Sequence, residues 1–503
     1  MLLQKIINFV RCSTKAKNGF ARRLPKYILS NMLQRKYITF GLNICLLCAA
    51  GMPLATLTAR STPGTDATTG ATTGAATGNN AQTEELSEYF GKHLKGEAEP
   101  FGTDRTLSRS KVDAVRKQVW DAWCAANNRF NEEKLGPLRP LTNDNPGYWK
   151  LPEELEPHAT MPYYWGSKGE RPEAGYPLFL YIHGSGPKEH EWSTGFKLCS
   201  SFDDAPSAYF IPQIPNEKDY YRWAIPSKQY AWEKLLRQAF VTGDINPDRI
   251  YFFGISEGGY GSQRMASFYA DYLAAAGPMA GGEPLKNAPA ENCGNIGFSL
   301  LTGAKDFGFY RNELTGYAIE AYDSLLKAHP DRFKHRIQLI PERGHGIDYS
   351  PTTPWLKQHV RNPYPKHVTW EDFDMYGRYR QGFYNIVVNK RDGNGARTYY
   401  EMDIEGNHIR LNISDVTYET TKKDPQWGIE LRFRRTYSPA KHCDITLYLC
   451  DQLVDLRKKV TLTVNGKEVF SGRVKPNLRH MVNSCRTFFD PQRIYPAAID
   501  VKF

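Results

Sequence analysis

One short stretch, residues 249–260, constrains the fold of this chain more than any other. Ile-Tyr-Phe-Phe at 250–253 is an apolar run of β-branched and aromatic side chains, typical of a strand covered on both faces. The next five residues, from Gly254 to Gly258, follow the pattern G-x-S-x-G. This pattern predicts a turn so tight that neither glycine has room for a Cβ atom. The turn would present the Ser256 hydroxyl at the head of a helix, whose dipole favours negative charge. Ser256 is therefore the candidate nucleophile, and an ordinary turn serine is the alternative.

The length and charge of the chain bound its class. With 503 residues, the chain is long enough for two domains and additional tails. Its net charge of +11 would suit a nucleic-acid-binding protein, but residues 1–60 hold ten Lys and Arg and no Asp or Glu. The basic excess is therefore a property of the N-terminus, and we expect no nucleic-acid partner.

The N-terminal residues have the composition of an export segment. A basic stretch at 1–37 precedes an apolar stretch at 38–59, which predicts a signal peptide or N-terminal anchor over residues 1–60. Residues 61–83 are rich in Thr, Gly and Ala, and we expect them to form a disordered linker. The chain is thus predicted to be exported, as a periplasmic, secreted or envelope-anchored protein, and to meet a membrane only through this anchor.

Cysteine spacing does not favour a metal site. The six cysteines after residue 60 are Cys124, Cys199, Cys293, Cys443, Cys450 and Cys485, and no two have C-x-x-C spacing. Disulfides and buried free thiols are both compatible with their positions. The sequence also lacks a phosphate loop, an EF-hand and a His-Glu-x-x-His helix, so we expect neither a metal nor a cofactor.

The globular part divides by its hydrophobic pattern into residues 84–362 and 363–503. The first part alternates strands and helices, which predicts an α/β fold with a mostly parallel sheet and helices on both faces. Its strands are expected at 161–165, 178–182, 208–211, 250–253, 274–279, 297–302 and 336–340, and its helices at 110–129, 229–240, 258–272 and 314–328. The second part has short alternating segments, at 382–389, 398–404, 408–413, 428–433, 444–449 and 459–464. These predict a smaller, sandwich-like all-β domain.

A serine nucleophile needs a base and an orienting acid, in the chain order serine, acid, histidine. His345 directly follows the strand expected at 336–340 and lies between two glycines, so it is the candidate base. Asp306 follows the preceding strand and is the candidate acid. Glu283 is the competing acid, whereas Asp348 comes after the histidine and breaks the order.

Two further groups of residues complete the candidate site. The backbone N–H groups of Glu257 and of Ser185, in the loop His183-Gly-Ser-Gly186, are the candidate oxyanion donors. Four aromatic residues are candidates for a substrate-binding platform, and ordinary packing is the alternative for each. They are Trp192, Trp223, Tyr260 and Trp355.

These motifs resemble those of a known superfamily. Residues 246–259 are similar to the nucleophile turn of bacterial secreted serine esterases of the α/β-hydrolase superfamily. That branch includes feruloyl and acetyl xylan esterases, polyhydroxybutyrate depolymerase-like enzymes and predicted serine peptidases. Similar loops lie at 180–186, 302–306 and 343–346, and residues 460–497 resemble a C-terminal accessory β domain found after such hydrolases.

The resemblance implies an α/β-hydrolase fold with Ser256 as nucleophile, Asp306 as acid and His345 as base. It implies a serine hydrolase that cleaves carboxylic esters through an acyl-enzyme, similar to a carbohydrate esterase. The implied partner is an acylated carbohydrate or another ester, and polysaccharide degradation is the implied role. A serine peptidase on the same fold and a non-catalytic, carbohydrate-binding envelope protein are the alternatives.

Overall fold

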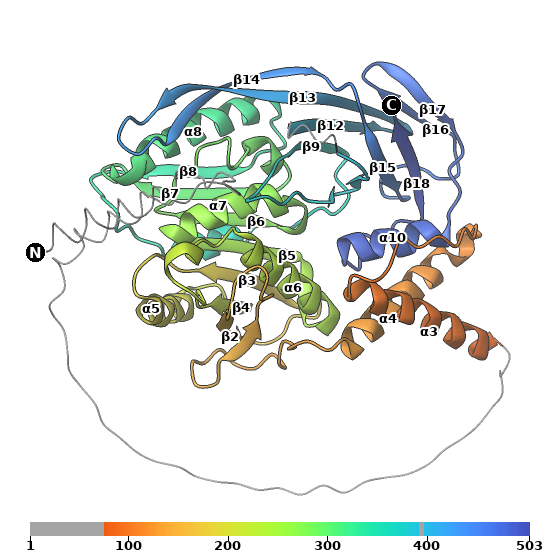
Figure 1. The fold of residues 1–503 in the computed structure, drawn as a ribbon, viewed down its shortest axis with the longest axis horizontal. Coiled ribbons are helices and arrows are strands. Elements are labelled where there is room, and N and C mark those ends of the chain that lie inside the picture. Colours follow the sequence, from red (N-terminus) through yellow and green to blue (C-terminus); the bar gives the residue numbers. More distant parts are fainter. Residues whose placement is uncertain (1–74, 392–396) are drawn as a thin grey trace, which may run out of the picture. The chain divides into compact units, whose positions relative to one another are not determined.

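The computed structural model describes residues 75–391 and 397–503 (Figure 1). The predicted export segment and most of the predicted linker lie outside these residues. Residues 75–83, which the composition assigns to the linker, instead begin helix α3 (Ala75–Leu94). Further along α3, Leu86 and Phe90 are buried with residues of α4 (Val112–Arg129), and this packing stabilises the helix.

The centre of the molecule is an eight-stranded sheet in the order β1-β2-β4-β3-β5-β6-β7-β8. Pairing is antiparallel among β1, β2 and β4 and parallel from β4 to β8. The strands are β1 (Gly147–Lys150), β2 (Thr160–Lys168), β3 (Tyr176–Ile182), β4 (Ser207–Pro212), β5 (Ile245–Ile255), β6 (Ala275–Met279), β7 (Gly297–Gly303) and β8 (His335–Ile340). β3, β4, β6 and β7 are buried along their whole length, as expected of strands covered on both faces.

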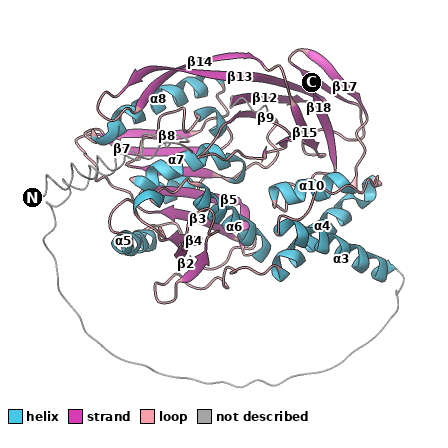
Figure 2. Ribbon diagram, in the orientation of Figure 1, coloured by secondary structure: helices cyan, strands magenta, loops and turns pink. Residues whose placement is uncertain are grey.

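Helices cover the sheet on both faces, as Figure 2 shows. They are α5 (Lys188–Ser201), α6 (Pro226–Thr242), α7 (Glu257–Tyr269), α8 (Arg311–Ala328) and the short α9 (Thr352–Leu356). Leu180 and Phe252 face one core, together with residues of α6 and α7. Their neighbours Tyr181 and Phe253 face a second core, together with residues of α5 and α9. The predicted α/β-hydrolase fold, with the candidate nucleophile after β5, is thereby confirmed.

The C-terminal part contains two further sheets. One has the order β10-β11-β15-β18, and the other has the order β17-β16-β13-β12-β9, with β14 added to β13. The strands are β9 (His367–Asp372), β10 (Gly382–Phe383), β11 (Ile386–Val388), β12 (Arg397–Glu405), β13 (His408–Lys423), β14 (Glu430–Pro439), β15 (Asp444–Leu449), β16 (Val460–Val464), β17 (Lys467–Gly472) and β18 (Ala497–Lys502). Trp370 on β9 stacks on Phe383 on β10 with ring centroids 5.4 Å apart, so the two sheets share a core as in a sandwich.

Helix α10 (Leu478–Phe488) interrupts this β region and was not expected from the strand pattern. Its buried face packs against α3 and α4 near the other end of the described chain. Asn477 is the N-cap residue directly before the helix, and its side-chain oxygen accepts a hydrogen bond from the backbone N–H of Arg479.

Buried ion pairs connect the two parts of the chain. Arg493 binds Asp271, in the 3₁₀ turn Ala270–Tyr272 that follows α7, at 2.5 Å, and Asp490 at 2.8 Å. Arg361 binds Asp490 at 2.6 Å, and all four of these side chains are fully buried. Because a buried charge is costly without its partner, the pairs bind the C-terminal segment firmly to the sheet domain. The division at residues 362 and 363 stays a prediction.

The six cysteines after residue 60 are free thiols, and five of them are buried. Of the two readings open from the sequence, free thiols are therefore confirmed. Among residues 75–391 and 397–503, no helix has the length and apolar character to cross a membrane.

Candidate active site

Ser256 occupies the tight turn between β5 and α7. Its backbone has φ 57° and ψ −114°, a conformation that non-glycine residues rarely adopt. A Cβ on Gly254 would lie 2.5 Å from the Ile182 carbonyl oxygen, and one on Gly258 would lie 2.0 Å from the same atom. The expectation that these two positions exclude side chains is confirmed. The backbone of β3 and the turn glycines thus hold the serine in place.

His345 connects Ser256 to Asp306. Its Nε2 lies 3.0 Å from the Ser256 Oγ, and its Nδ1 lies 2.7 Å from an Asp306 carboxylate oxygen. Asp306 is buried, whereas the His345 side chain is 46% exposed and is open to solvent and substrate. The three residues follow β5, β7 and β8 at the carboxyl edge of the sheet. The structure therefore brings together the three side chains singled out from the sequence.

The acid and histidine loops are packed against each other. A Cβ on Gly303, at the end of β7, would lie 1.9 Å from the Gly344 carbonyl oxygen. The backbone N–H of Lys305 also donates to the Arg343 carbonyl at 2.8 Å. A residue larger than glycine at position 303 would push the two loops apart, and with them the carboxylate and the imidazole.

Asp306 has a second partner that the sequence analysis missed. The guanidinium of Arg311 donates two hydrogen bonds to the carboxylate, at 2.6 and 2.8 Å. Burial raises the pKa of Asp306, but the hydrogen bonds from His345 and Arg311 outweigh it and leave the pKa below its ordinary value. The carboxylate therefore stays ionised and accepts the His345 Nδ1–H.

The competing acids are occupied elsewhere. Glu283 accepts hydrogen bonds from Arg264 at 2.6 and 3.1 Å and from Asn287 at 3.1 Å. Asp348 accepts from the backbone N–H of Ser350 within its own turn. Of the three carboxylates considered, only Asp306 is hydrogen-bonded to His345.

The loop that carries Ser185 passes directly against the nucleophile. A Cβ on Gly184 would lie 3.5 Å from the Ser256 Cβ. The Gly186 N–H donates to Glu191 at 3.2 Å, whereas the Ser185 N–H has no acceptor among the described residues. The Glu257 N–H, at the first position of α7, has no acceptor within that helix. Neither predicted donor is thus engaged by an acceptor within its own loop or helix.

Side chains beneath this loop fix its path. The buried His183 ring contacts the Gly184 carbonyl through Nδ1 at 2.8 Å and accepts the Ile214 N–H through Nε2 at 3.1 Å. Burial lowers the pKa of His183 to about 4, so this ring is neutral. Trp223 donates from its indole N–H to the His183 carbonyl at 2.9 Å.

This contact corrects the prediction for Trp223. Its side chain is fully buried, so it supports the loop from below and cannot serve as a substrate platform. Trp192 is half-buried, stacks on Tyr164 at 4.0 Å and donates to the Ile211 carbonyl. Tyr260 is also half-buried, and burial raises the pKa of its hydroxyl. The Trp355 ring packs against the His359 ring in a tilted arrangement, with ring centroids 4.3 Å apart. Packing therefore accounts for most of the surface of these rings.

Two exposed aromatic residues were not singled out from the sequence. Phe307 directly follows Asp306 and is 70% exposed. Tyr376 is 40% exposed and lies over the Arg264 guanidinium at 4.9 Å, on a turn of the C-terminal part. Neither position has a pattern that marks it, because exposure at a turn depends on the tertiary fold.

The side chain of Glu257 is also part of this neighbourhood. It is paired with Arg222 at 3.0 Å and is largely buried. Burial raises its pKa, and the positive charge of Arg222 opposes the shift. The ion pair holds the residue after the nucleophile at the start of α7.

Comparison with solved structures finds distant likenesses to esterases. No family model and no curated protein matches it. A thermostable esterase aligns at 20% identity over 43% of this chain and 63% of that chain, with a TM-score of 0.33. A ferulic acid esterase aligns at 13% identity over 42% of this chain and 97% of that chain, with a TM-score of 0.33. A mutant feruloyl esterase module from Clostridium thermocellum, complexed with sinapinate, aligns at 11% identity over 46% of this chain and 98% of that chain, with a TM-score of 0.30. Likenesses this distant carry no argument about activity, which must come from the site.

Proposed function

We propose that this chain is a serine hydrolase that cleaves carboxylic esters through an acyl-enzyme intermediate. One observation carries the proposal: Ser256, in a strained turn, is hydrogen-bonded to His345, which is hydrogen-bonded to the buried Asp306. A base in contact with the hydroxyl and an acid that orients the base are what a serine needs to act as a nucleophile.

The reaction follows from this geometry. The Ser256 Oγ attacks the ester carbonyl carbon while His345 Nε2 takes its proton. The resulting oxyanion accepts hydrogen bonds from the Ser185 and Glu257 N–H groups, each such donor being typically worth roughly 10²–10³ in rate. His345 then gives the proton to the departing alcohol oxygen, and the acyl group remains on the serine. Water, deprotonated by His345, attacks the acyl-enzyme and releases the acid and the free serine.

Throughout this cycle Asp306 remains ionised. It accepts the Nδ1–H of His345 and so keeps Nε2 free to face the nucleophile. It also stabilises the imidazolium that forms when His345 takes the proton. The two hydrogen bonds from Arg311 hold the carboxylate in the orientation that both tasks need.

The substrate part of the proposal is an acyl group on an extracellular polysaccharide. Its support is the predicted export segment at 1–60 and the resemblance of residues 246–259 to secreted esterases. The exposed His345 suits a large substrate, because the reacting atoms are open to solvent.

A fluorophosphonate probe tests the nucleophile. We expect the wild-type chain to be labelled and Ser256→Ala to remain unlabelled. No labelling of the wild type would favour a non-catalytic binding protein instead.

Substrate choice is tested by rates on p-nitrophenyl and feruloyl esters, on acylated oligosaccharides and on peptide amides. We expect efficient turnover of esters. Efficient amide cleavage with negligible ester turnover would assign the same triad to a peptidase.

A further inference from the structure

The acid loop, residues 306–311, contacts a distant part of the chain. β13 and β14 form a long hairpin over α8, and residues 424–429, the hairpin tip, join them (Figure 1). Tyr310 donates its hydroxyl hydrogen bond to Asp424 at 2.6 Å. The ring of Phe309 packs against the ring of Trp427, with ring centroids 6.1 Å apart. Two neighbouring residues of the acid loop are thus held by two residues of the hairpin tip.

These same two loop residues have an unusual backbone. Phe309 has φ 53° and Tyr310 has φ 61°, so consecutive aromatic residues lie in the left-handed region. Bulky residues adopt this conformation only where surrounding contacts hold them. Since Arg311 follows them directly, the left-handed turn sets where its guanidinium meets Asp306.

A continuous line of contacts runs from the hairpin tip to the nucleophile. The Phe309 ring, against Trp427, also faces the Arg311 guanidinium at 5.8 Å. Arg311 binds both carboxylate oxygens of Asp306, at 2.6 and 2.8 Å. Asp306 binds His345, and His345 binds Ser256, at 2.7 and 3.0 Å.

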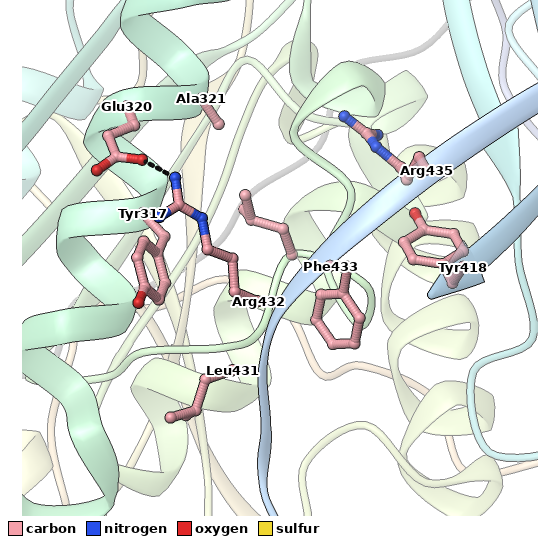
Figure 3. Close-up of a pocket in the computed structure, with 9 residues that line it drawn as sticks. Tyr317, Glu320, Ala321, Tyr418, Leu431, Arg432, Phe433 and Arg435 are labelled. Carbon is pink, nitrogen blue, oxygen red and sulfur yellow. Dashed lines mark hydrogen bonds and ion pairs between the residues drawn. The ribbon is translucent and has the colours of Figure 1, made fainter. Parts of the chain in front are cut away.

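The body of the hairpin covers a cavity. The cavity has a volume of about 220 Å³. Figure 3 shows its lining between α8 and β14, with Tyr317 and Glu320 on one side and Leu431 and Phe433 on the other. At its rim Arg432 reaches across to Glu320 at 2.8 Å, an ion pair that is more than half exposed on both sides. Each charged side chain that lines this cavity is in an ion pair. The lining therefore offers no unpaired charge that would indicate a ligand site.

We propose that the hairpin tip is a positioning element for the catalytic acid: Asp424 and Trp427 hold the left-handed turn that directs Arg311 and Asp306 at His345. This inference rests on the proposed function, since it assigns Asp306 to the triad. It gives the C-terminal β region a part in catalysis without contact with the substrate.

The main test uses Trp427→Ala and Tyr310→Phe, each measured with a short p-nitrophenyl ester. Since a displacement of about 1 Å at a catalytic group can cost roughly 10²-fold, we expect kcat to fall about 10–100-fold in Trp427→Ala and less in Tyr310→Phe. KM should change little, because a short ester does not reach the hairpin. Trp427→Phe, which keeps a ring against Phe309, should recover most of the rate.

A matched control separates this effect from general damage to the hairpin. Glu419→Gln removes an exposed ion pair with Arg434 on the same two strands, away from the acid loop, and should leave kcat unchanged. Thermal unfolding of each variant shows whether it is folded, and Tyr310→Phe, which removes a single hydroxyl, serves if Trp427→Ala does not fold.

The decisive measurement is made in an Asp306→Ala background. If the tip acts through Asp306, adding Trp427→Ala there should cause no further loss of kcat. An equal loss with and without Asp306, or a wild-type kcat in both Trp427→Ala and Tyr310→Phe, would overturn the proposal. Failure of the fluorophosphonate probe to label the wild type would instead overturn the proposed function, and this inference with it.

Discussion

The nucleophile and the acid of this site are held in place in opposite ways. Ser256 is constrained by backbone: Gly254 and Gly258 lie so close to the Ile182 carbonyl that no side chain fits between them. Asp306 is constrained by side chains. Arg311 binds its carboxylate, and Tyr310 in the same loop is hydrogen-bonded to Asp424, more than a hundred positions away.

This difference decides what a sequence can reveal. A turn that requires glycine at fixed spacing leaves a local pattern, and residues 254–258 have it. A loop held by long-range contacts leaves no pattern, because an arginine five residues after an aspartate is common. The comparison predicts that changes at the nucleophile turn are severe and local, whereas changes at the acid loop are graded.

The largest effect is expected for Ser256→Ala. Removing the nucleophile should lower kcat by several orders of magnitude, roughly 10⁴–10⁶. Steady-state hydrolysis of a p-nitrophenyl ester measures it, with thermal unfolding as the check on folding. Retention of most of the activity would show that the hydrogen-bonded serine is not the nucleophile.

Gly258→Ala should break the nucleophile turn. The new Cβ would lie 2.0 Å from the Ile182 carbonyl oxygen, and backbone cannot move aside as a side chain does. We expect the free energy of unfolding to fall by about 1–3 kcal/mol or more, as for an overpacked core. Denaturant unfolding measures this loss, and labelling by the probe should fail along with it. A stable, fully labelled variant would contradict the view that backbone crowding holds Ser256.

Arg311→Met tests the acid side. With both hydrogen bonds to Asp306 removed, we expect kcat to fall by about 10- to 100-fold through misplacement of the carboxylate. The pH profile should change as well. Arg311 helps to keep the pKa of Asp306 low against the effect of burial, so removing it raises that pKa. The ionised, active form is then lost at a higher pH, and the acidic limb of the kcat profile moves upward.

Measuring kcat from acidic to neutral pH in the wild type and in Arg311→Met checks this shift. Arg311→Lys retains the charge but not the bidentate hydrogen bond. The acidic limb of its kcat profile should therefore lie close to that of the wild type, whereas its kcat should recover less. An acidic limb that stays in place in Arg311→Met would mean that Arg311 does not set the ionisation of Asp306.

The smallest effects are expected for two loop glycines. A Cβ on Gly308 would lie 2.6 Å from a guanidinium nitrogen of Arg311, which is the far end of a side chain and not backbone. Gly308→Ala should therefore fold normally and lower kcat by only a few-fold, since Arg311 must shift slightly. Gly344, in the histidine loop, has open space where a Cβ would point, and Gly344→Ala should be silent. Equal losses in Gly258→Ala, Gly308→Ala and Gly344→Ala would remove the distinction between the two kinds of support.

Much of the fold could be predicted because its local patterns agree with its tertiary structure. The apolar runs at 178–182 and 250–253 became β3 and β5, buried on both faces. Its place after the strand that precedes the histidine strand favoured Asp306 over Glu283 as the acid, and the hydrogen bond to His345 agrees. Glycines on both sides of His345 indicated a projecting imidazole, which the distances to Ser256 and Asp306 bear out.

What could not be predicted depends on depth and on long-range packing. Trp223 and Tyr376 are both aromatic residues in loops, yet one is fully buried and the other is 40% exposed. No local feature separates them, since burial is decided by which loops come to lie above. Helix α10 did leave a trace, because Leu478, Met481, Val482 and Cys485 recur at helical spacing. The strand-like segments around it predict an all-β region over residues 363–503 and mask this trace.

The shared core of α3, α4 and α10 has a consequence for folding during synthesis. Leu86, Val119 and Trp123 are buried against Met481 and Val482, residues that the ribosome adds several hundred positions later. Until the last part of the chain has been made, the first helices of the globular part have no cover for their apolar faces. Such long-range contacts form slowly. A chain shortened at its C-terminus would lack α10, so α3 and α4 would lose the residues that bury their apolar faces.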